Sequence, residues 1–582
     1  MEVTNSNFSE ALPQIQEAIE RCTFMAVDCE FTGLNITRNI NALDTPQEYY
    51  QKVRRNCKEF LIIQYGLCTF RYDAESNTFK KKDFNFYIFR RPVNKNVPDQ
   101  RFLCQTSSIH FLVNESFDFN KLFKEGISYL NKEDIEKYKD AVEESYKRRS
   151  DLIQSQQNST NESIPIPENA KGFIDDVIGQ LGEFIKSDKD ELELPRCNAF
   201  YRRLVYQTKS EKFPDNISIE TRQINKDRIL FATKFKNKEK EEEAERNKYN
   251  KDLKELDDHI GFSKVIQMII NSRKLVVGHN ICLDLLHTID KFLMALPEDY
   301  YDFKGMAHDL FPKILDTKYL SSCEPFKDII TSNVLKHLYD TLSQEPFGIP
   351  TIETEDGVQG YTIGNIKEHE AGFDAYLTGV CFLAMWKYLG AAKKFDDTKT
   401  FSNFNLLEPY INRIFVMKLL DNQYINLGGK DLNPPRDHVF HLTFPKEWRA
   451  NDISQLFSPF GNVYVSWIDE TSAYVTLYKK DQAAKALNSL SNAESYKIMT
   501  YAKRKALLRG VSTPFSSPTV MKKRKSSEGP PSKRIKLDSS NNDSVLHPKR
   551  SIDSIEEEQL ESENSQSSRS TTKAFIEDSS WE

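Results

Sequence analysis

The stretch that decides the fold is "FMAVDCEFTGL", residues 24–34. Residues 24–31 are apolar except for Asp28 and Glu30, and such a run predicts a buried β-strand. Successive side chains on a strand point to opposite faces, so these two acids project from the same face. Burying two like charges together is costly, because each raises the cost of ionising the other. The strand therefore requires a positive partner on that face.

The size and composition of the chain exclude several classes of protein. With 582 residues it is long enough for about three or four domains. A net charge of −6 gives no general attraction for nucleic acid, so any such binding needs local basic patches. The nine cysteines are scattered and never spaced C-x-x-C, which argues against a disulfide framework or structural zinc and favours a reducing compartment. Without a leader or a long apolar run, we expect no secretion and no membrane span.

Changes in composition divide the first three quarters of the chain. Residues 1–154 mix strand-like runs, such as "FLIIQYGLCTF", with helical ones, and this α/β pattern resumes over residues 235–430. The polar, proline-bearing segment 155–171 predicts a linker. Residues 172–234 predict a small domain with a helix and strand-like runs. The small domain therefore interrupts one larger α/β domain.

Three further segments have their own patterns. Residues 235–258, the start of the resumed α/β region, carry both charge signs at helical spacing, which predicts a solvated helix with i to i+4 ion pairs. Residues 437–505 show a β-α-β-β-α-β order typical of an RNA-recognition motif. Residues 510–582 are rich in Ser, Lys, Glu and Asn with few aromatics, which predicts a disordered tail.

More acids follow in the resumed α/β region. The segment "KLVVGHNICLDLLHTIDKF" places Asp284 on a helix after a strand, and "HEAGFDAYLTGVCFLAMWKYL" places His369 and Asp374 at the start of another helix. Together with Asp28 and Glu30, these carboxylates would line the kind of oxygen-rich pocket that Mg²⁺, or Mn²⁺ in its place, prefers. Two such ions about 4 Å apart would neutralise the acids and hold a phosphodiester for in-line attack. A pair of metal ions is thus the predicted positive partner.

The order D-x-E, N-x-x-x-D, H-x-x-x-x-D resembles the signature of the DEDDh exonucleases. Blocks running in order to about residue 505 are similar to the poly(A)-specific ribonuclease family, a deadenylase family; they include "DCEFTGL", "DTPQEYYQK", "GHNICLDLLHT", "LFPKILDTK" and "SWIDETSAYV". The resemblance implies a ribonuclease-H-like exonuclease core, an inserted nucleic-acid-binding domain of the Arg-x-x-x-His type and an RNA-recognition motif. It also implies a homodimer that removes 3′ poly(A) from messenger RNA, releases 5′-AMP and, in some members, binds the 5′ cap.

Five residues carry the catalytic roles that this resemblance implies. Asp28, Glu30, Asp284 and Asp374 would be the metal ligands, and His369 would be the general base that deprotonates or orients the attacking water. Imidazole titrates near neutral pH, which suits it to that role. Taken singly, the acids could be surface or capping residues and the histidine structural. The presence of all five in the family order favours the catalytic interpretation.

The resemblance also implies contacts with RNA. Phe31 and Leu34 match family positions near the terminal nucleotides, and an aromatic ring there could stack on a base. Lys318, in "LDTK", matches a position near the adenine end. The alternatives are that Phe31 packs in the core and that Lys318 is a surface lysine.

The accessory domains depart from their usual motifs. Arg203 is followed four residues later by Gln207 instead of histidine, so the role of the insert in RNA guidance and dimer contact rests on the resemblance alone. On the third strand of the RNA-recognition motif, Tyr474 alone remains of the usual stacking pattern. Trp467 matches the family position that stacks on the cationic cap base. The alternative is a half-buried strand tryptophan.

Two basic runs, "KKRK" (522–525) and "KRIK" (533–536), resemble a bipartite nuclear import signal, so we expect the protein in nucleus and cytoplasm. Nonspecific RNA binding is the alternative use of these runs. Two other functions remain for the whole chain. One is a trimmer of small non-coding RNA 3′ ends that uses the same site, and the other is a catalytically silent RNA-binding protein. The intact set of five residues argues against the second.

Overall fold

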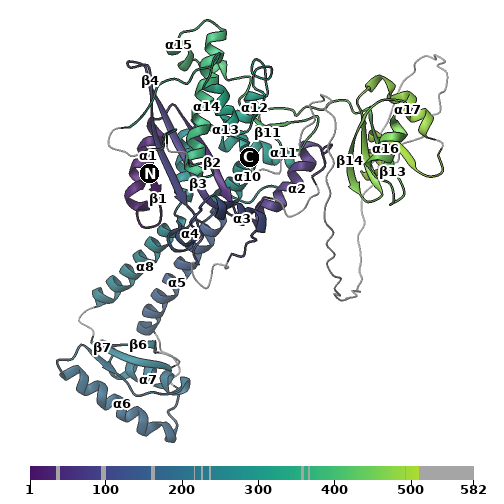
Figure 1. Ribbon diagram of the computed structural model, residues 1–582. Helices are drawn as coiled ribbons and strands as arrows, with labels where there is room; N and C mark the ends of the chain where they lie inside the picture. The colour runs from purple at the N-terminus through teal and green to yellow at the C-terminus, as the bar shows by residue number, and fades with distance from the viewer. Residues whose placement is uncertain are drawn as a thin grey trace, which may run out of the picture. The chain divides into compact units, whose positions relative to one another are not determined.

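The computed structural model describes residues 1–34, 40–92, 100–158, 164–214, 216–224, 227–234, 238–355, 360–364, 367–491 and 493–509 (Figure 1). The chain forms two units, Met1–Tyr501 and Ala502–Glu582. The predicted disordered tail and both basic runs lie outside the described residues. Within the described part of the chain, every helix is too short or too polar to cross a bilayer.

The first unit is built around a seven-stranded mixed sheet, in the order β1-β4-β3-β2-β8-β9 with β10 also pairing with β4. β2, β3 and β4 are antiparallel neighbours, whereas β8 and β9 run parallel to β2. The strands are β1 (Glu2–Val3), β2 (Phe24–Phe31), β3 (Ile62–Asp73), β4 (Thr78–Tyr87), β8 (Leu275–Gly278), β9 (Ile314–Asp316) and β10 (Ile352–Thr354).

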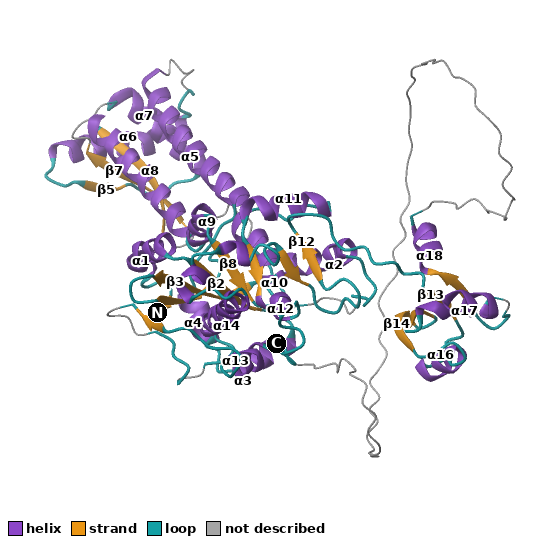
Figure 2. Ribbon diagram, turned by 90° about the horizontal axis from the view of Figure 1, so that it is seen from above, coloured by secondary structure: helices purple, strands orange, loops and turns teal. Residues whose placement is uncertain are grey.

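Helices cover both faces of this sheet (Figure 2). One face packs on a layer that includes α1 (Phe8–Arg21), α2 (Pro46–Glu59), α9 (Ser263–Ser272), α10 (Cys282–Thr288), the π-helix Ile289–Leu293 and α11 (Tyr300–Leu310). The other face packs on α12 (Thr317–Ser321), α13 (Leu335–Leu342), α14 (Ala371–Ala392) and α15 (Asp397–Phe401). Smaller elements complete the core: α3 (Thr106–Asn114), α4 (Phe119–Glu125), a 3₁₀ turn (Phe404–Leu406), β11 (Arg413–Phe415) and β12 (Tyr424–Asn426).

The predicted strand 24–31 is confirmed as β2, in the middle of the sheet. Its alternation follows the expected period of two. Phe24 and Ala26 join the core beside α14, whereas Met25, Val27 and Cys29 join the opposite core. By the same alternation, Asp28 and Glu30 face α14. The alternative that Asp28 and Glu30 are ordinary surface acids is therefore wrong for this strand, which lies inside the sheet.

The insert has its own hydrophobic core, which includes Ile174, Leu181, Leu204 and Ile217. It contains two helices and a three-stranded sheet in the order β5-β7-β6. Its elements are α6 (Glu168–Lys186), β5 (Glu191–Glu193), α7 (Ala199–Lys212), β6 (Ile217–Ile224) and β7 (Asp227–Lys234).

The predicted linker 155–171 is too long. α5 (Lys132–Asn158) runs past residue 155, and α6 begins at Glu168, directly after Pro165 and Pro167, residues that interrupt helices. The charged helix is present as α8 (Lys238–Ile260), but it is not simply solvated. It packs against α5, where the Tyr146 and Tyr249 rings lie 4.6 Å apart and Arg149 pairs with Glu245 at 2.6 Å.

The RNA-recognition motif has the predicted β-α-β-β-α-β order and a four-stranded sheet, β14-β15-β13-β16. A short helix that the sequence did not predict, α18, follows its last strand. Its elements are β13 (Val439–Thr443), α16 (Ala450–Phe457), β14 (Val463–Asp469), β15 (Ser472–Leu477), a 3₁₀ turn (Lys480–Gln482), α17 (Ala483–Leu490), β16 (Lys497–Thr500) and α18 (Tyr501–Leu508).

Candidate active site

Three of the predicted acids meet where β2 faces the start of α14. One carboxylate oxygen each from Asp28, Glu30 and Asp374 lies within 4.8 Å of the other two. The strand supplies two of them through its period of two, and Asp374 comes from the first turn of α14. Side chains 346 residues apart in sequence (374 − 28) thus share one pocket.

Asp284 lies beside this group but is oriented differently. It sits in the first turn of α10, its side chain is buried, and its carboxylate accepts hydrogen bonds from Cys29 on the opposite face of β2. It is still near enough to raise the pKa of Asp28 and of Glu30. The structure therefore brings three of the four acids into direct proximity and holds the fourth at their side.

Burial dominates the electrostatics of the site. It raises the pKa of Asp28 and of Glu30 well above the usual range, and the neighbouring carboxylates raise both further. Burial likewise raises the pKa of Asp284 to about 7, although the hydrogen bonds from Cys29 act in the opposite direction. Such a group of acids is unfavourable by itself, and a bound cation would relieve it.

The donor set fits a hard divalent cation. The three clustered side chains offer carboxylate oxygens only, which suit Mg²⁺ or Mn²⁺, whereas zinc and copper sites usually include histidine or cysteine. Cys29, between Asp28 and Glu30 in sequence, has its pKa raised by burial and by the acids, so it remains protonated and is a poor ligand. Asp28, Glu30 and Asp374 are the residues that would hold the metal, with Asp284 beside them.

The stability of the metal-free protein should therefore depend on pH. A carboxyl whose folded pKa exceeds its unfolded value, about 4, binds more protons when folded. Its contribution to stability is therefore lost as the pH rises through the folded pKa, about 7 for Asp284. In EDTA, we expect the free energy of unfolding from urea titrations to fall between about pH 5 and pH 7.5.

Magnesium should reverse this loss, because the cation binds the deprotonated carboxylates. The rise in melting temperature on adding Mg²⁺ should be larger at about pH 7.5 than at about pH 5.5. In an Asp284→Asn variant, both the pH dependence and its reversal should be weaker. An equal effect of Mg²⁺ at the two pH values would contradict the expectation.

His369 lies just before the start of α14, and its backbone conformation holds it there. It adopts the left-handed region with φ +65°, which few residues other than glycine take. Its backbone N–H donates to Asp374 Oδ2 at 3.0 Å. Its ring packs edge-on against Phe111 of α3, with 4.7 Å between ring centroids. The structure thus links the predicted base directly to a predicted metal ligand, and Phe111 is a contact that sequence reasoning missed.

Asp316, at the end of β9, is another acid whose role only the structure defines. Its carboxylate accepts hydrogen bonds from the backbone N–H groups of Asn280, Ile281 and Lys318, and also from those of Tyr319 and Phe415. The carboxylate is fully buried, and these five bonds satisfy its oxygens. In return, it fixes the loop before α10. The carboxylate of Asp316 is therefore used to hold the local backbone.

The predicted RNA contacts differ in their surroundings. Phe31 is half-buried, with its ring 4.8 Å from that of His287. The backbone N–H of Leu34 donates to Gln105 Oε1 at 3.1 Å. Lys318 is only 6% exposed and lies over the Phe415 ring, so the surface-lysine alternative is wrong. Their roles toward RNA stay predictions.

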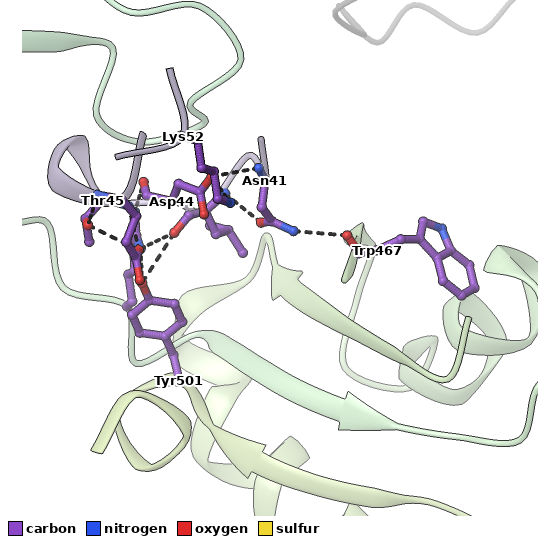
Figure 3. Close-up of polar contacts among 9 residues, drawn as sticks. Asn41, Asp44, Thr45, Lys52, Trp467 and Tyr501 are labelled. Atoms are coloured by element: carbon purple, nitrogen blue, oxygen red, sulfur yellow. Dashed lines mark hydrogen bonds and ion pairs between the residues drawn. The ribbon is translucent and has the colours of Figure 1, made fainter. Parts of the chain in front are cut away.

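Trp467, on β14, is 42% exposed, so part of its ring is open to solvent while the rest packs on the protein. The Phe444 ring meets the Trp467 ring edge-on, with 5.3 Å between ring centroids. The backbone carbonyl of Trp467 accepts a hydrogen bond from Asn41 Nδ2 at 3.1 Å. Figure 3 shows the indole turned away from Asn41.

The usual stacking face of the RNA-recognition motif is covered by the chain itself. Tyr474 is 6% exposed, in a cluster with Leu43, Val439 and Tyr501. The Tyr501 hydroxyl also donates to the Leu43 carbonyl at 3.3 Å, within the polar contacts drawn in Figure 3. Because Tyr474, its last stacking aromatic, is buried, this face of the sheet offers no ring for ordinary stacking on single-stranded RNA.

Known proteins resemble the chain over most of its length. The CAF1 family ribonuclease domain matches residues 3–382, and an RNA binding domain matches residues 429–507. The poly(A)-specific ribonuclease PARN of Xenopus laevis is 42% identical over 509 residues, covering 86% of this chain and 81% of its own. The pre-piRNA 3′-exonuclease trimmer of Bombyx mori is 25% identical, covering 88% of this chain and 95% of its own. Among solved structures, Pop2p of S. pombe in its Mg²⁺- and Mn²⁺-bound form is 14% identical, with a TM-score of 0.32 over 66% of this chain and 91% of its own.

Proposed function

Because the chain belongs to the CAF1 ribonuclease family and is similar to poly(A)-specific ribonucleases, we propose that it shortens the poly(A) tails of messenger RNA. It would act as a 3′-to-5′ exoribonuclease and release 5′-AMP. The observation that carries this function is the cluster of Asp28, Glu30 and Asp374 oxygens within 4.8 Å, with His369 bound to Asp374. Two-metal hydrolysis of a phosphodiester uses bound cations together with a base, and this arrangement offers both.

The acids would hold two Mg²⁺ ions, or Mn²⁺ in their place, with Asp284 completing the set. Cations bound there would neutralise the carboxylates and stabilise the charge that develops on the phosphodiester. His369 stands next to these ligands and accepts the proton of the attacking water. Its strained backbone, held by Asp374, limits the positions that its ring can adopt.

The terminal nucleotides would lie against Phe31, Leu34 and Lys318. Phe31 offers a half-buried ring for stacking on a base, a contact of about 1–3 kcal/mol. Lys318 offers a cation that the surrounding protein holds in place, because its side chain is buried. The insert would guide RNA toward this site and contribute to a homodimer, although it lacks the Arg-x-x-x-His signature.

The test is degradation of 5′-labelled RNAs that share one body and end in A, U or C, in Mg²⁺, with products sized over time. We expect stepwise shortening from the 3′ end, fastest for the A-tailed RNA, with 5′-AMP as the product. Shortening of all three tails at one rate would favour the alternative, a trimmer of small non-coding RNA 3′ ends. No shortening by the metal-loaded protein would contradict the proposed function.

Trp467 would bind the 5′ cap. Its indole is exposed on β14, a strand of the sheet whose usual stacking aromatic is buried, so a flat cationic base has one aromatic face available there. Stacking of the positive 7-methylguanine on this ring would contribute up to about 2 kcal/mol. Capped RNA should then be preferred to uncapped RNA.

Replacing Trp467 with alanine should abolish binding of a cap analogue and remove the preference for capped RNA, because the stacking surface is lost. Quenching of tryptophan fluorescence and isothermal titration would measure this. Ile468→Ala is the matched control, since this neighbour is 41% exposed and has no ring. Equal cap affinity in the wild type and the Trp467→Ala protein would show that the tryptophan only packs against Phe444.

The protein would act as a homodimer in the nucleus and the cytoplasm. The family resemblance supports the dimer, and the basic runs at 522–525 and 533–536 support nuclear import. Light scattering of the purified protein and imaging of a tagged chain, with and without the two runs, would test both points.

A further inference from the structure

The start of α14 is capped by the sheet instead of by its own side chains. The N-cap residue Glu370 makes no side-chain capping bond. The backbone N–H of Ala371 instead donates to Gln64 Oε1 at 2.9 Å, and that of Gly372 donates to Asn85 Oδ1 at 3.0 Å. Both amides are buried, Gln64 on β3 and Asn85 on β4. Two otherwise unpaired donors of the helix thus find their acceptors on adjacent strands.

The same amide of Asn85 also reaches the residue between His369 and the helix. Its Nδ2 donates to Glu370 Oε1 at 3.0 Å, and the Tyr361 hydroxyl donates to the same oxygen at 2.5 Å. Glu370 is therefore fixed from two sides. Because His369 precedes it directly and Asp374 follows one turn later, this bond constrains both ends of the short segment that carries them.

A glycine on β3 allows the close approach of the helix. A Cβ at position 66 would lie 1.8 Å from the carbonyl oxygen of Ala371, so only glycine fits there. Gly66 pairs with Asp28 on one side and with Asn85 on the other. The close contact between Gly66 and Ala371 of α14 therefore lies directly across from Asp28, the first acid of the site.

We propose that Gln64 and Asn85 are positioning residues that set the depth and rotation of α14, and so place His369 and Asp374 against the acids of β2. This inference rests on the proposed nuclease function. Gln64 is the cross-strand partner of Glu30, but the hydrogen bonds of both amides go to the start of α14 and to Glu370, so we expect the amides to act through the helix. Without these hydrogen bonds, the start of α14 is no longer fixed to β3 and β4, while the rest of the helix stays packed in the core.

Loss of one amide should lower kcat and leave KM nearly unchanged. A displacement of about 1 Å at reacting groups can cost about 10²-fold in rate, so we expect kcat to fall between about 10- and 10²-fold. KM should change little, since the predicted RNA contacts lie on other elements. Gln64→Met and Asn85→Leu remove the acceptors at similar volume. Thr69→Val is the matched control, because Thr69 is a buried polar residue of β3 whose hydroxyl bonds to Lys82 of the neighbouring strand.

A polarity exchange distinguishes positioning from general stability. Asn85→Asp keeps the acceptor for Gly372 but places a carboxylate against Glu370, so kcat should fall. Adding Glu370→Gln restores a donor–acceptor pair between the two side chains, and kcat should recover. Glu370→Gln alone should be nearly neutral, because the glutamine oxygen still accepts from Asn85 and Tyr361. The measurements are steady-state rates on A-tailed RNA in Mg²⁺ and melting temperatures of the full chain.

The outcomes separate this proposal from the proposed function. It is supported if the Gln64 and Asn85 variants lose kcat and the exchange restores it, while Thr69→Val changes stability at most. It is overturned if the amide variants keep wild-type kcat, or if kcat falls only in proportion to the folded fraction. If the wild-type protein shows no nuclease activity, it is the proposed function that fails.

Discussion

Asparagine in place of Asp28 is expected to lower the rate of RNA hydrolysis by more than about 10³-fold in saturating Mg²⁺, with the fold intact. The same result is expected for Glu30→Gln and Asp374→Asn. Each change removes a carboxylate from a cluster whose oxygens lie within 4.8 Å of one another. With one acid missing, the remaining groups cannot hold and neutralise the cations in the geometry that in-line attack requires. Single-turnover rates on A-tailed RNA would measure the loss.

The stability of these variants should move in the opposite direction. The pKa of Asp28 is raised by burial and by its acidic neighbours, so an uncharged amide relieves repulsion in the metal-free protein. In EDTA at about pH 7.5, Asp28→Asn should melt at a higher temperature than the wild type, and Mg²⁺ should stabilise it less. Asp431→Asn is a matched control, because this acid pairs with Lys304 at 3.0 Å, outside the cluster. Near wild-type hydrolysis by Asp28→Asn would remove Asp28 from the metal site.

His369→Ala should lower kcat by about 10²–10⁴-fold, the usual range for loss of a general base. RNA binding should change little, because the predicted base contacts come from other residues. Metal binding, read from the Mg²⁺-induced rise in melting temperature, should also persist, because the backbone N–H that donates to Asp374 remains in the variant. This combination would distinguish a lost base from a lost metal site.

His337→Ala is the matched control for that experiment. His337 is an exposed histidine of α13 that bonds to Ser332, so its loss should leave kcat unchanged. Wild-type turnover by His369→Ala at neutral pH would exclude His369 from the reaction. If His369→Ala lost both its activity and the Mg²⁺-induced rise in melting temperature, the histidine would serve the metal site and not the attacking water.

The sequence by itself determined the elements with local, periodic patterns. The alternation along residues 24–31 is set by strand geometry, so it predicted both β2 and the common face of Asp28 and Glu30. The four acids and His369 were predicted because their order matches that of a family, and the chain is 42% identical to a poly(A)-specific ribonuclease. The RNA-recognition motif was predicted in the same way, from the order of its short strands and helices.

Only the tertiary structure decided how these elements meet. Asp284 turns toward Cys29, and Tyr474 is covered by Leu43 and Tyr501, because packing between distant segments selects those orientations. Gln64 was visible in the sequence only as a polar residue within an apolar strand. Its partner, Ala371, lies 307 positions along the chain. Local propensity carries no information about such a contact, since a buried amide finds its hydrogen-bond partner only when the sheet and the helix have come together.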